Sequence, residues 1–235
     1  MRSGVDPHLG AFTPPLTPTG WPVYRIVPSR FPPVSLFDRI VDAADLESVF
    51  AIEALTNDRL RDEVGEISLV PVEDRVTGPG STPIMAAFTH LHEEGARFND
   101  STFSAYYAAR DLDTAVAETK YHRERFLAYT NEARIDIDMR AYVARLNCEL
   151  HDLRTGAPPA LYDPESYRIS QKFGRSLREQ GSNGVIYRSV RAVDGTCVAI
   201  FRPRCLSDCR QERHLTYCWD GSRISQVYEK REYSP

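Results

Sequence analysis

The sequence predicts an α/β fold of the α+β kind, in which mixed central β-sheets are flanked by helices. Three observations predict this class. Segments in which apolar and polar residues alternate recur along the chain, segments of helical periodicity lie between them, and Asp220-Gly221-Ser222 marks a tight turn between two alternating segments. With 235 residues and 42% hydrophobic residues, the chain can bury a sizeable core, and we expect a single domain.

The N-terminal part is predicted to be an extended arm followed by the domain proper. Residues 1–20 contain four prolines and few apolar residues, which disfavours a folded element there. The domain then covers residues 21–235. It begins with a strand over residues 21–27, which carries Arg25.

An enlarged helical segment is expected at about residues 35–94, between Arg25 and Arg97. Apolar residues recur at helical spacing over residues 36–63, although their phase drifts. We therefore expect a helix with a break in it.

The end of this segment leads to an arginine in a loop. Residues 67–72 are a brief β-rich stretch, and glycine and proline at 77–81 predict a loop. A helix is expected from Pro83 to Glu94 and is stopped by Gly95. Arg97 is thus expected just past a helix end.

A strand and a helix follow. Residues 101–109 alternate like a strand and contain Tyr107. Asp111 can cap a helix that runs to about residue 128. Glu118 lies on the flank of that helix, where a carboxylate can line the wall of a cleft. The apolar face of the helix is expected to consist of Leu112, Ala115, Val116, Thr119 and Phe126.

The C-terminal half is predicted to contain one helix and several strands. The helix is expected at about residues 164–180, stopped by Gly181. Strands are expected at residues 135–139, 142–150, 185–190, 197–202, 214–219 and 223–229, of which the last two form a hairpin around the Asp-Gly turn.

Charge and hydropathy argue against two classes of partner. The formal net charge of -4 provides no electrostatic footprint for nucleic acid, and no block of Lys and Arg suggests a membrane surface. Neither a signal-peptide pattern nor a run of roughly 18 apolar residues occurs. We therefore expect a cytoplasmic protein that acts on a small molecule or a protein.

The cysteines allow two interpretations. There are five, an odd number, which fits reduced thiols better than a disulfide framework. Cys205, Cys209, His214 and Cys218 superficially suggest a zinc knuckle. Their spacing is irregular, however, and the last two alternate with apolar residues as in a strand, so we favour buried thiols and expect no metal site.

Familiar nucleotide-binding signatures are absent from the sequence. It contains neither Gly-x-Gly-x-x-Gly after a strand nor the Gly-x-x-x-x-Gly-Lys-Ser/Thr phosphate loop. A dinucleotide would have to be held by arginines instead.

The most informative stretch is Gly95-Ala96-Arg97-Phe98-Asn99, which precedes Tyr107 and Glu118. A guanidinium can bind a pyrophosphate, an aromatic ring can bound a nicotinamide, and a carboxylate can stabilise positive charge at a ribose. Cleavage of the nicotinamide-ribose bond passes through an oxocarbenium-like transition state and releases neutral nicotinamide, so it requires no general acid. The set suits an enzyme that consumes NAD+.

The chain resembles the RES-domain toxins of bacterial toxin-antitoxin modules, which are named for an Arg, a Glu and a Ser. Ala96 departs from the family, since many relatives have a second glycine there. The matching segments are Trp21 to Arg25, Gly95 to Asn99, Ala105 to Ala109, Thr114-Ala115 followed by Glu118, Gly184 to Val190, His214 to Tyr217 and Trp219 to Gly221.

The resemblance implies an ADP-ribosyltransferase-like fold that acts on NAD+ and a helix-turn-helix antitoxin that blocks the site. It implies Glu118, Arg97 and Tyr107 as catalytic residues, with Arg25 and Ser189 joining Arg97 and Tyr107 in binding NAD+. The acceptor of the ADP-ribose is left open. Water or phosphate would make the enzyme an NAD+ glycohydrolase or phosphorylase, and a protein side chain would make it a mono-ADP-ribosyltransferase.

The residues alone also allow other interpretations. Arg97 can cap the preceding helix or form a salt bridge, and Glu118 can pair with His122 or Arg123 on its own helix. Arg25 can be a solvated residue of an edge strand. The chain would then be a non-enzymatic binding module whose arginine cleft holds an acidic partner segment.

Overall fold

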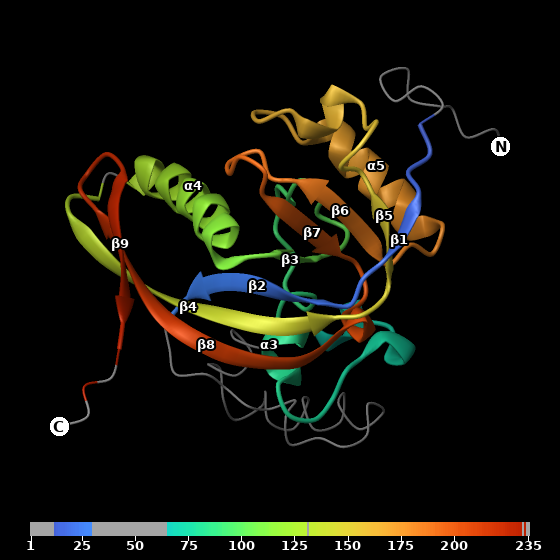
Figure 1. Ribbon diagram of the computed structural model, residues 1–235, viewed down its shortest axis with the longest axis horizontal. Helices are drawn as coiled ribbons and strands as arrows, with labels where there is room; N and C mark the ends of the chain where they lie inside the picture. Colours follow the sequence, from blue (N-terminus) through green and yellow to red (C-terminus); the bar gives the residue numbers. More distant parts are fainter. Residues whose placement is uncertain (1–11, 30–64, 131, 232, 234–235) are drawn as a thin grey trace.

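A computed structural model describes residues 12–29, 65–130, 132–231 and 233 (Figure 1). The helix expected over residues 36–63 lies outside these residues. The strands are β1 (Leu16–Pro18), β2 (Trp21–Pro28), β3 (Tyr106–Ala109), β4 (Ile135–Leu146), β5 (Glu149–Asp152), β6 (Gly184–Arg188), β7 (Thr196–Ile200), β8 (Leu206–Trp219) and β9 (Ile224–Lys230). The helices are α3 (Ser81–Met85), α4 (Leu112–Thr130) and α5 (Arg168–Glu179), with 3-10 helices η2 (Ile67–Leu69), η3 (Val72–Asp74), η4 (Pro159–Tyr162) and η5 (Pro203–Cys205).

In the described part of the chain, the strands form one mixed sheet in the order β1-β5-β6-β7-β3-β2-β4-β8-β9. Neighbouring strands are antiparallel except β5 and β6, which are parallel and are separated in the chain by α5. This mixed sheet with flanking helices confirms the predicted fold class (Figure 1). The end of the expected N-terminal arm contributes β1, which pairs with β5.

The two faces of the sheet pack into two separate cores. One, the α3-side core, contains Tyr106 and Ile84; the other, the α4-side core, contains Phe98 and Leu127 and is covered by α4 and α5. Because side chains alternate along a strand, Tyr106 enters the first core and Tyr107 packs against the second. Figure 1 shows α3 on one side of β4 and β8, with α4 and α5 on the other.

Helix α4 begins with the predicted cap. A carboxylate oxygen of Asp111 accepts the N–H of Thr114 at 2.7 Å, which satisfies one of the free donors of the first turn. Phe126 was expected on the apolar face, and this is wrong, because its side chain is 58% exposed. Leu127, one residue on, is only 6% exposed and holds that position instead.

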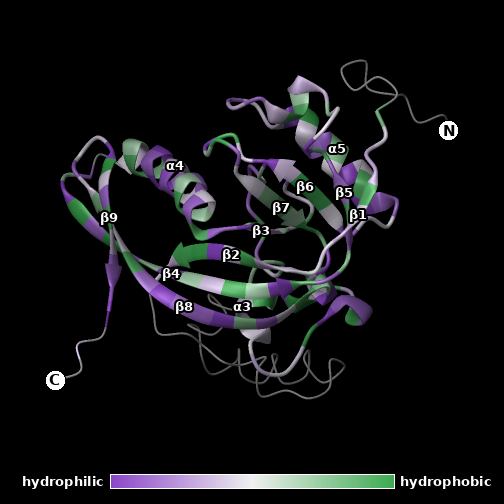
Figure 2. Ribbon diagram, in the orientation of Figure 1, coloured by the Kyte–Doolittle hydropathy of each residue, from purple (hydrophilic) through white to green (hydrophobic). Residues whose placement is uncertain are grey.

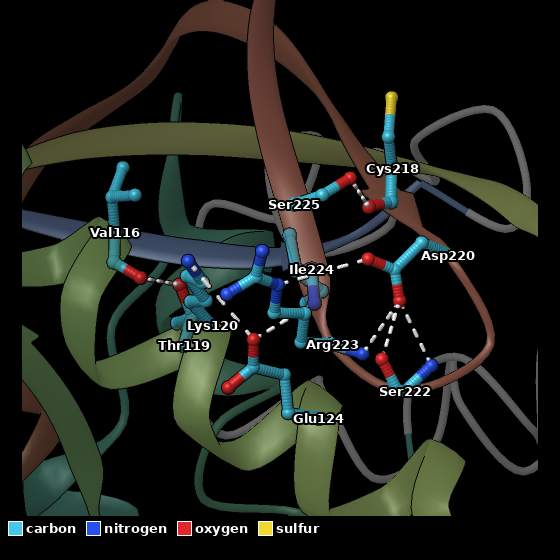
Figure 3. A network of polar contacts seen from close by, with 10 residues as sticks. All are labelled: Val116, Thr119, Lys120, Glu124, Cys218, Asp220, Ser222, Arg223, Ile224 and Ser225. Carbon is cyan, nitrogen blue, oxygen red and sulfur yellow. Dashed lines mark hydrogen bonds and ion pairs between the residues drawn. The ribbon is translucent and has the colours of Figure 1, made fainter.

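The hairpin of β8 and β9 fixes the second half of α4 (Figure 3). Glu124 accepts the N–H of Ile224 at 2.8 Å. Thr119 also shares a hydrogen bond of 2.7 Å with the hydroxyl of Tyr217 on β8. Asp220 shapes the turn by accepting three donors, which are the N–H and hydroxyl of Ser222 and the N–H of Arg223. The predicted Asp-Gly hairpin is confirmed and serves to hold α4 against the sheet.

Strand β8 is longer than the strand predicted at residues 214–219. Its first half is polar (Figure 2). Asp208, Arg210 and Gln211 in this half are exposed. Only residues 215–219 are buried in succession. Sequence alternation therefore marks the strand only where it enters the core, whereas its pairing with β4 extends it back to Leu206.

The β-rich stretch predicted at residues 67–72 is wrong, because these residues form η2 and the start of η3. Ile67 and Val70 are 5% and 3% exposed. A 3-10 turn brings residues three apart to the same side, so two apolar residues at this spacing favour the turn. Pro71 follows and has no N–H to donate to a ladder.

The helix predicted from Pro83 to Glu94 is wrong in extent. Helix α3 begins at Ser81 and ends at Met85. Residues 90–94 are all exposed, so they offer no apolar face that would stabilise further turns.

The strand predicted over residues 101–109 is shortened to β3. Asp100 accepts both the N–H and the hydroxyl of Thr102, at 2.9 and 2.6 Å, and thereby forms a local turn. Such side-chain bonds compete with strand pairing, and the ladder begins only at Tyr106.

The strands predicted at residues 135–139 and 142–150 are instead a single strand β4 followed by β5. Arg140 and Ala141 lie between the two predicted strands, yet Arg140 is only 9% exposed and Ala141 is fully buried. The strands predicted at 185–190 and 197–202 are confirmed as β6 and β7, and the predicted helix near 164–180 is confirmed as α5.

Candidate active site

The segment Gly95–Asn99 forms a tight loop before β3. The N–H of Ala96 donates to the carbonyl of Asn99 at 2.8 Å, which closes the loop. Gly95 adopts a φ of +66°, and a Cβ at this position would collide with the carbonyl oxygen of Asn99. Glycine is therefore required here, and the closed loop presents Arg97 from a fixed backbone.

Helix α5 holds this loop from the side. The side-chain nitrogen of Gln171 donates to the carbonyls of Glu94 and Ala96, at 2.8 and 3.2 Å. Gly174 lies against the loop so closely that a Cβ would collide with the carbonyl oxygen of Phe98. The position of Arg97 is thus set by α5 as well as by the loop itself.

Arg97 is only 6% exposed and its guanidinium has a defined setting. Nη1 donates to the carbonyls of Asp163 and Leu161, at 2.9 and 3.3 Å, and the group lies 4.6 Å from the ring centre of Tyr167. The nearest preceding helix ends at Met85, so Arg97 does not cap it. Among the described residues Arg97 forms no ion pair, and its Nε and Nη2 make no hydrogen bond.

Tyr107 connects β3 to the loop Gly95–Asn99 that carries Arg97. Its hydroxyl donates to the side-chain oxygen of Asn99 at 2.9 Å and accepts the N–H of Phe98 at 2.8 Å. Burial raises the pKa of Tyr107 well above its ordinary value. The residue is therefore a neutral brace for the loop, and its ring remains the part that can face a ligand.

Glu118 has its two carboxylate oxygens in different settings. Oε1 accepts the hydroxyl of Ser189 at 2.6 Å, the N–H of Val190 at 3.3 Å and the thiol of Cys197 at 3.8 Å. In the part of the chain that the structure describes, Oε2 makes no hydrogen bond and neither oxygen forms an ion pair. The expected alternative of a pair with His122 or with a neighbouring arginine is not observed there.

Ser189 forms a direct hydrogen bond with Glu118. Its hydroxyl donates to Glu118 and accepts the N–H groups of Arg191 and Ala192, at 3.0 and 2.8 Å. The serine was expected to be a polar group of the ligand site. The structure places it as the residue that orients the carboxylate and shapes the loop between β6 and β7.

Four of the five expected residues come together on the α4 side of the sheet. Glu118, Tyr107 and Arg97 all influence the pKa of Tyr187, which burial raises well above its ordinary value. Ser189 touches Glu118 directly. Together with the hydrogen bonds of Tyr107 to Phe98 and Asn99, these interactions place the loop of Arg97, β3, α4 and the β6–β7 loop around one site.

Arg25 is not brought to this site. Its Nη1 donates to the backbone carbonyl of Tyr107 at 3.0 Å, and its guanidinium lies 4.9 Å from the ring centre of Tyr106. Tyr106 belongs to the α3-side core, so this guanidinium lies on the opposite face of the sheet from Arg97 and Glu118. Burial lowers the pKa of Arg25.

The direction of Arg25 follows from strand alternation. On β2, Tyr24 and Ile26 pack on the α4-side core, so the residue between them points to the other face. Strands β2 and β3 pair only at Tyr24 and Ala109. Arg25 therefore supplies a donor to a β3 carbonyl that the backbone of β2 does not reach.

The structure adds three residues that the sequence did not single out as site residues. Arg191 lies over the ring of Tyr121, 3.3 Å from its centre, and Nη2 donates to the carbonyl of Pro164 at 3.0 Å. Partial desolvation lowers the pKa of His122. The charge of Glu118 acts to raise this pKa, and the charges of Arg191 and Arg97 act to lower it further. Tyr121 and His122 follow Glu118 by three and four residues on α4, a spacing that places them on its side of the helix and could have identified them.

The cysteines of the C-terminal half form no metal cluster among the described residues. Cys205, Cys209 and Cys218 are buried, as the thiol interpretation expects. No group of three or more His, Cys, Asp and Glu side chains suited to a metal ion occurs in residues 12–29, 65–130 and 132–231. Within the same residues no helix is long and apolar enough to cross a membrane.

Comparisons with known proteins agree with the resemblance seen in the sequence. The family model "RES domain" matches residues 73–220. The uncharacterized protein y4oC of Sinorhizobium fredii is 35% identical over 205 residues, which cover 87% of this chain and 86% of that protein. Among solved structures, a chain of the M. tuberculosis MbcT-MbcA toxin-antitoxin complex is 13% identical, and the match covers 84% of this chain and 86% of that chain. The TM-score is 0.44, and a similarity this weak carries no argument about the site. The family match and the identity to y4oC show that the chain belongs to the RES-domain family.

Proposed function

We propose that this chain is a cytoplasmic toxin of a bacterial type II toxin-antitoxin module and that it cleaves the nicotinamide-ribose bond of NAD+. One observation carries the enzymatic part of the proposal. Glu118 has one oxygen held by three donors and the other unbonded among the described residues, with Arg97 and Arg191 nearby. A fixed carboxylate beside fixed guanidiniums suits a substrate that is cationic at one end and anionic in the middle.

The chemistry assigns a role to each group. Arg97 binds the pyrophosphate, because the Nε and Nη2 edge of a guanidinium matches two phosphate oxygens. The ring of Tyr107 bounds the nicotinamide. Glu118 stabilises the positive charge that develops on the ribose as the C1′–N bond breaks and the bonding electrons leave with neutral nicotinamide. Ser189 holds the carboxylate in place for this step.

The acceptor that ends the reaction is a separate question. Water, phosphate or a protein side chain adds to C1′ of the ribose and loses a proton where its chemistry requires, giving ADP-ribose, an ADP-ribose phosphate or an ADP-ribosylated protein. The bond-breaking step is common to all three. NAD+ is thus proposed as a substrate, and the same site serves each of the three acceptors.

An antitoxin partner follows from the proposed chemistry and from the RES-domain family. An enzyme that consumes NAD+ without restraint would harm its host. We propose that a helix-turn-helix antitoxin carries an acidic or carboxyl-terminal segment that occupies the site beside Arg97. Opposite charges would speed the association and make its rate depend on salt.

The test is incubation of the purified protein with NAD+ and chromatographic measurement of nicotinamide. Parallel reactions contain buffer alone, inorganic phosphate or a bacterial protein extract, and the ADP-ribosyl product identifies the acceptor. Nicotinamide is expected in at least one reaction. If none of the reactions releases nicotinamide, the proposed enzyme activity is contradicted and the non-enzymatic binding module is favoured.

A further inference from the structure

Arg191 has the attributes of a ligand-binding arginine. It lies in the loop between β6 and β7 and is partly buried. Its guanidinium is stacked on Tyr121 and bonded to the carbonyl of Pro164 through Nη2 alone. Among the described residues, its Nε and Nη1 make no hydrogen bond and no carboxylate pairs with it. A stacked arginine with unused donors is held in place and is still able to bind an anion.

Arg191 and Arg97 approach the same segment of the chain. Arg97 donates to the carbonyls of Leu161 and Asp163, and Arg191 donates to the carbonyl of Pro164. The two guanidiniums therefore lie along one short strap, residues 161–164. Both also act on the pKa of His122, which places both near the same part of α4.

The backbone of Arg191 is also tied to the proposed catalytic carboxylate. Ser189 accepts the N–H of Arg191 at 3.0 Å and donates to Glu118 at 2.6 Å. An anion bound by Arg191 would consequently have a fixed relation to Glu118. In the described part of the chain neither arginine forms an ion pair. The carboxylate of Asp163, in the strap itself, accepts the N–H groups of Glu165 and Ser166 instead.

We infer that Arg191 is a second anion-binding residue of the site, so that Arg97 and Arg191 each bind one phosphate of the pyrophosphate in NAD+ or ADP-ribose. This inference rests on the proposed function, because it needs a dinucleotide in the site. It explains why two separate guanidiniums converge on one strap. A ligand with two adjacent phosphates matches two guanidiniums better than a ligand with one phosphate.

The experiment measures binding by calorimetry of ADP-ribose, AMP and adenosine to the wild type, Arg191→Ala, Arg191→Lys and Arg110→Ala. Arg110 is the matched control, since it also stacks on an aromatic ring, at 5.3 Å from the ring centre of Trp21, but makes no contact with the strap. Near-ultraviolet circular dichroism and thermal unfolding check that each variant is folded. Arg191→Lys keeps the charge and retains a donor for Pro164 if the alanine variant is poorly folded.

Arg191→Ala should weaken ADP-ribose binding about tenfold or more, since hydrogen bonds to charged groups are of that strength. Arg191→Lys should be weakened to a smaller degree. The affinity for adenosine should not change, and Arg110→Ala should bind like the wild type. Equal ADP-ribose affinity in wild type and in both folded Arg191 variants would overturn the inference and leave the proposed function standing. Failure of the wild type to bind ADP-ribose would contradict both.

Discussion

The hydroxyl of Ser189 donates a hydrogen bond of 2.6 Å to Oε1 of Glu118. The two residues are 71 positions apart in the chain, and they meet where the β6–β7 loop passes α4. The same hydroxyl accepts two backbone N–H groups, so its orientation is determined from both sides. Glu118 is consequently held with one oxygen engaged and the other directed elsewhere.

Replacement of Ser189 by alanine should lower kcat more than it changes KM. The variant removes a donor that orients the carboxylate but no group that the proposal places on the substrate. A charge-assisted hydrogen bond contributes about 1.5–3 kcal/mol, which corresponds to a loss of about tenfold or more in kcat. Steady-state kinetics of nicotinamide release measure this. The control is Ser225→Ala, because among the described residues the Ser225 hydroxyl bonds only the carbonyl of Cys218. A rise in KM with kcat unchanged in Ser189→Ala would show that Ser189 binds substrate instead.

Arg97→Lys should weaken ADP-ribose binding although the charge is kept. Lysine lacks the planar fork that Arg97 uses to bond Asp163 and still offer an edge to phosphate. We expect a loss of about tenfold in affinity, measured by calorimetry. Arg145→Lys, which changes an exposed arginine paired with Asp208, should bind normally. An unchanged affinity in Arg97→Lys would show that Arg97 does not contact the phosphates.

Gly174→Ala should destabilise the protein, contrary to the usual effect of such a change in a helix. Alanine ordinarily stabilises a helix interior by roughly 0.5–1 kcal/mol over glycine. At this position, however, the new Cβ would collide with the carbonyl oxygen of Phe98, so the loop that carries Arg97 must move. We expect a loss of about 1–3 kcal/mol in the free energy of unfolding, measured with urea. Lys172→Ala, an exposed change on the same helix, should have little effect; a stabilised Gly174→Ala would refute the close contact.

Acidification should lower stability through His151. Burial lowers the pKa of His151 from its ordinary value of 6.5, and the ring nitrogen Nδ1 lies 2.8 Å from the hydroxyl of Ser182. The unfolded chain therefore binds the proton first, so the free energy of unfolding is highest above the ordinary pKa and falls as the pH drops below it. Thermal unfolding from pH 8 to pH 5 measures the effect. His151→Gln, which can still bond Ser182, should show a smaller decrease in melting temperature over this range, and an identical decrease would rule out His151 as its source.

Local signals in the sequence were sufficient for part of the fold. The cap at Asp111 and the Asp-Gly turn at 220–221 depend on a few neighbouring residues, and both are confirmed. The extent of β8 and the continuity of β4 depend on pairing between distant strands. Alternation is weak where these strands are exposed or carry a buried arginine, so the sequence could not reveal their ends.

The candidate site was likewise predictable only where it depends on local sequence patterns. The sequence predicted Arg97, Tyr107 and Glu118 in a loop, a strand and a helix. The structure brings them to one side of the sheet, where Phe98 of the loop and Tyr107 of β3 pack on the core that α4 covers. Alternation on β2 separates Arg25 from Tyr24, but it does not say which face holds the site. The contact between Ser189 and Glu118 likewise depends on how α4 packs over the sheet, which no local pattern encodes.

The measurement that tests the central claim most directly is nicotinamide release from NAD+ by the wild type, Glu118→Gln and Glu124→Gln. Glu124 is the matched control because it lies on the same helix and bonds the N–H of Ile224, which a glutamine can also do. The account predicts that the wild type and Glu124→Gln release nicotinamide, and that Glu118→Gln is slower by on the order of a hundredfold or more while remaining folded. Release at the wild-type rate by Glu118→Gln would contradict the role of Glu118 as the carboxylate that stabilises the transition state.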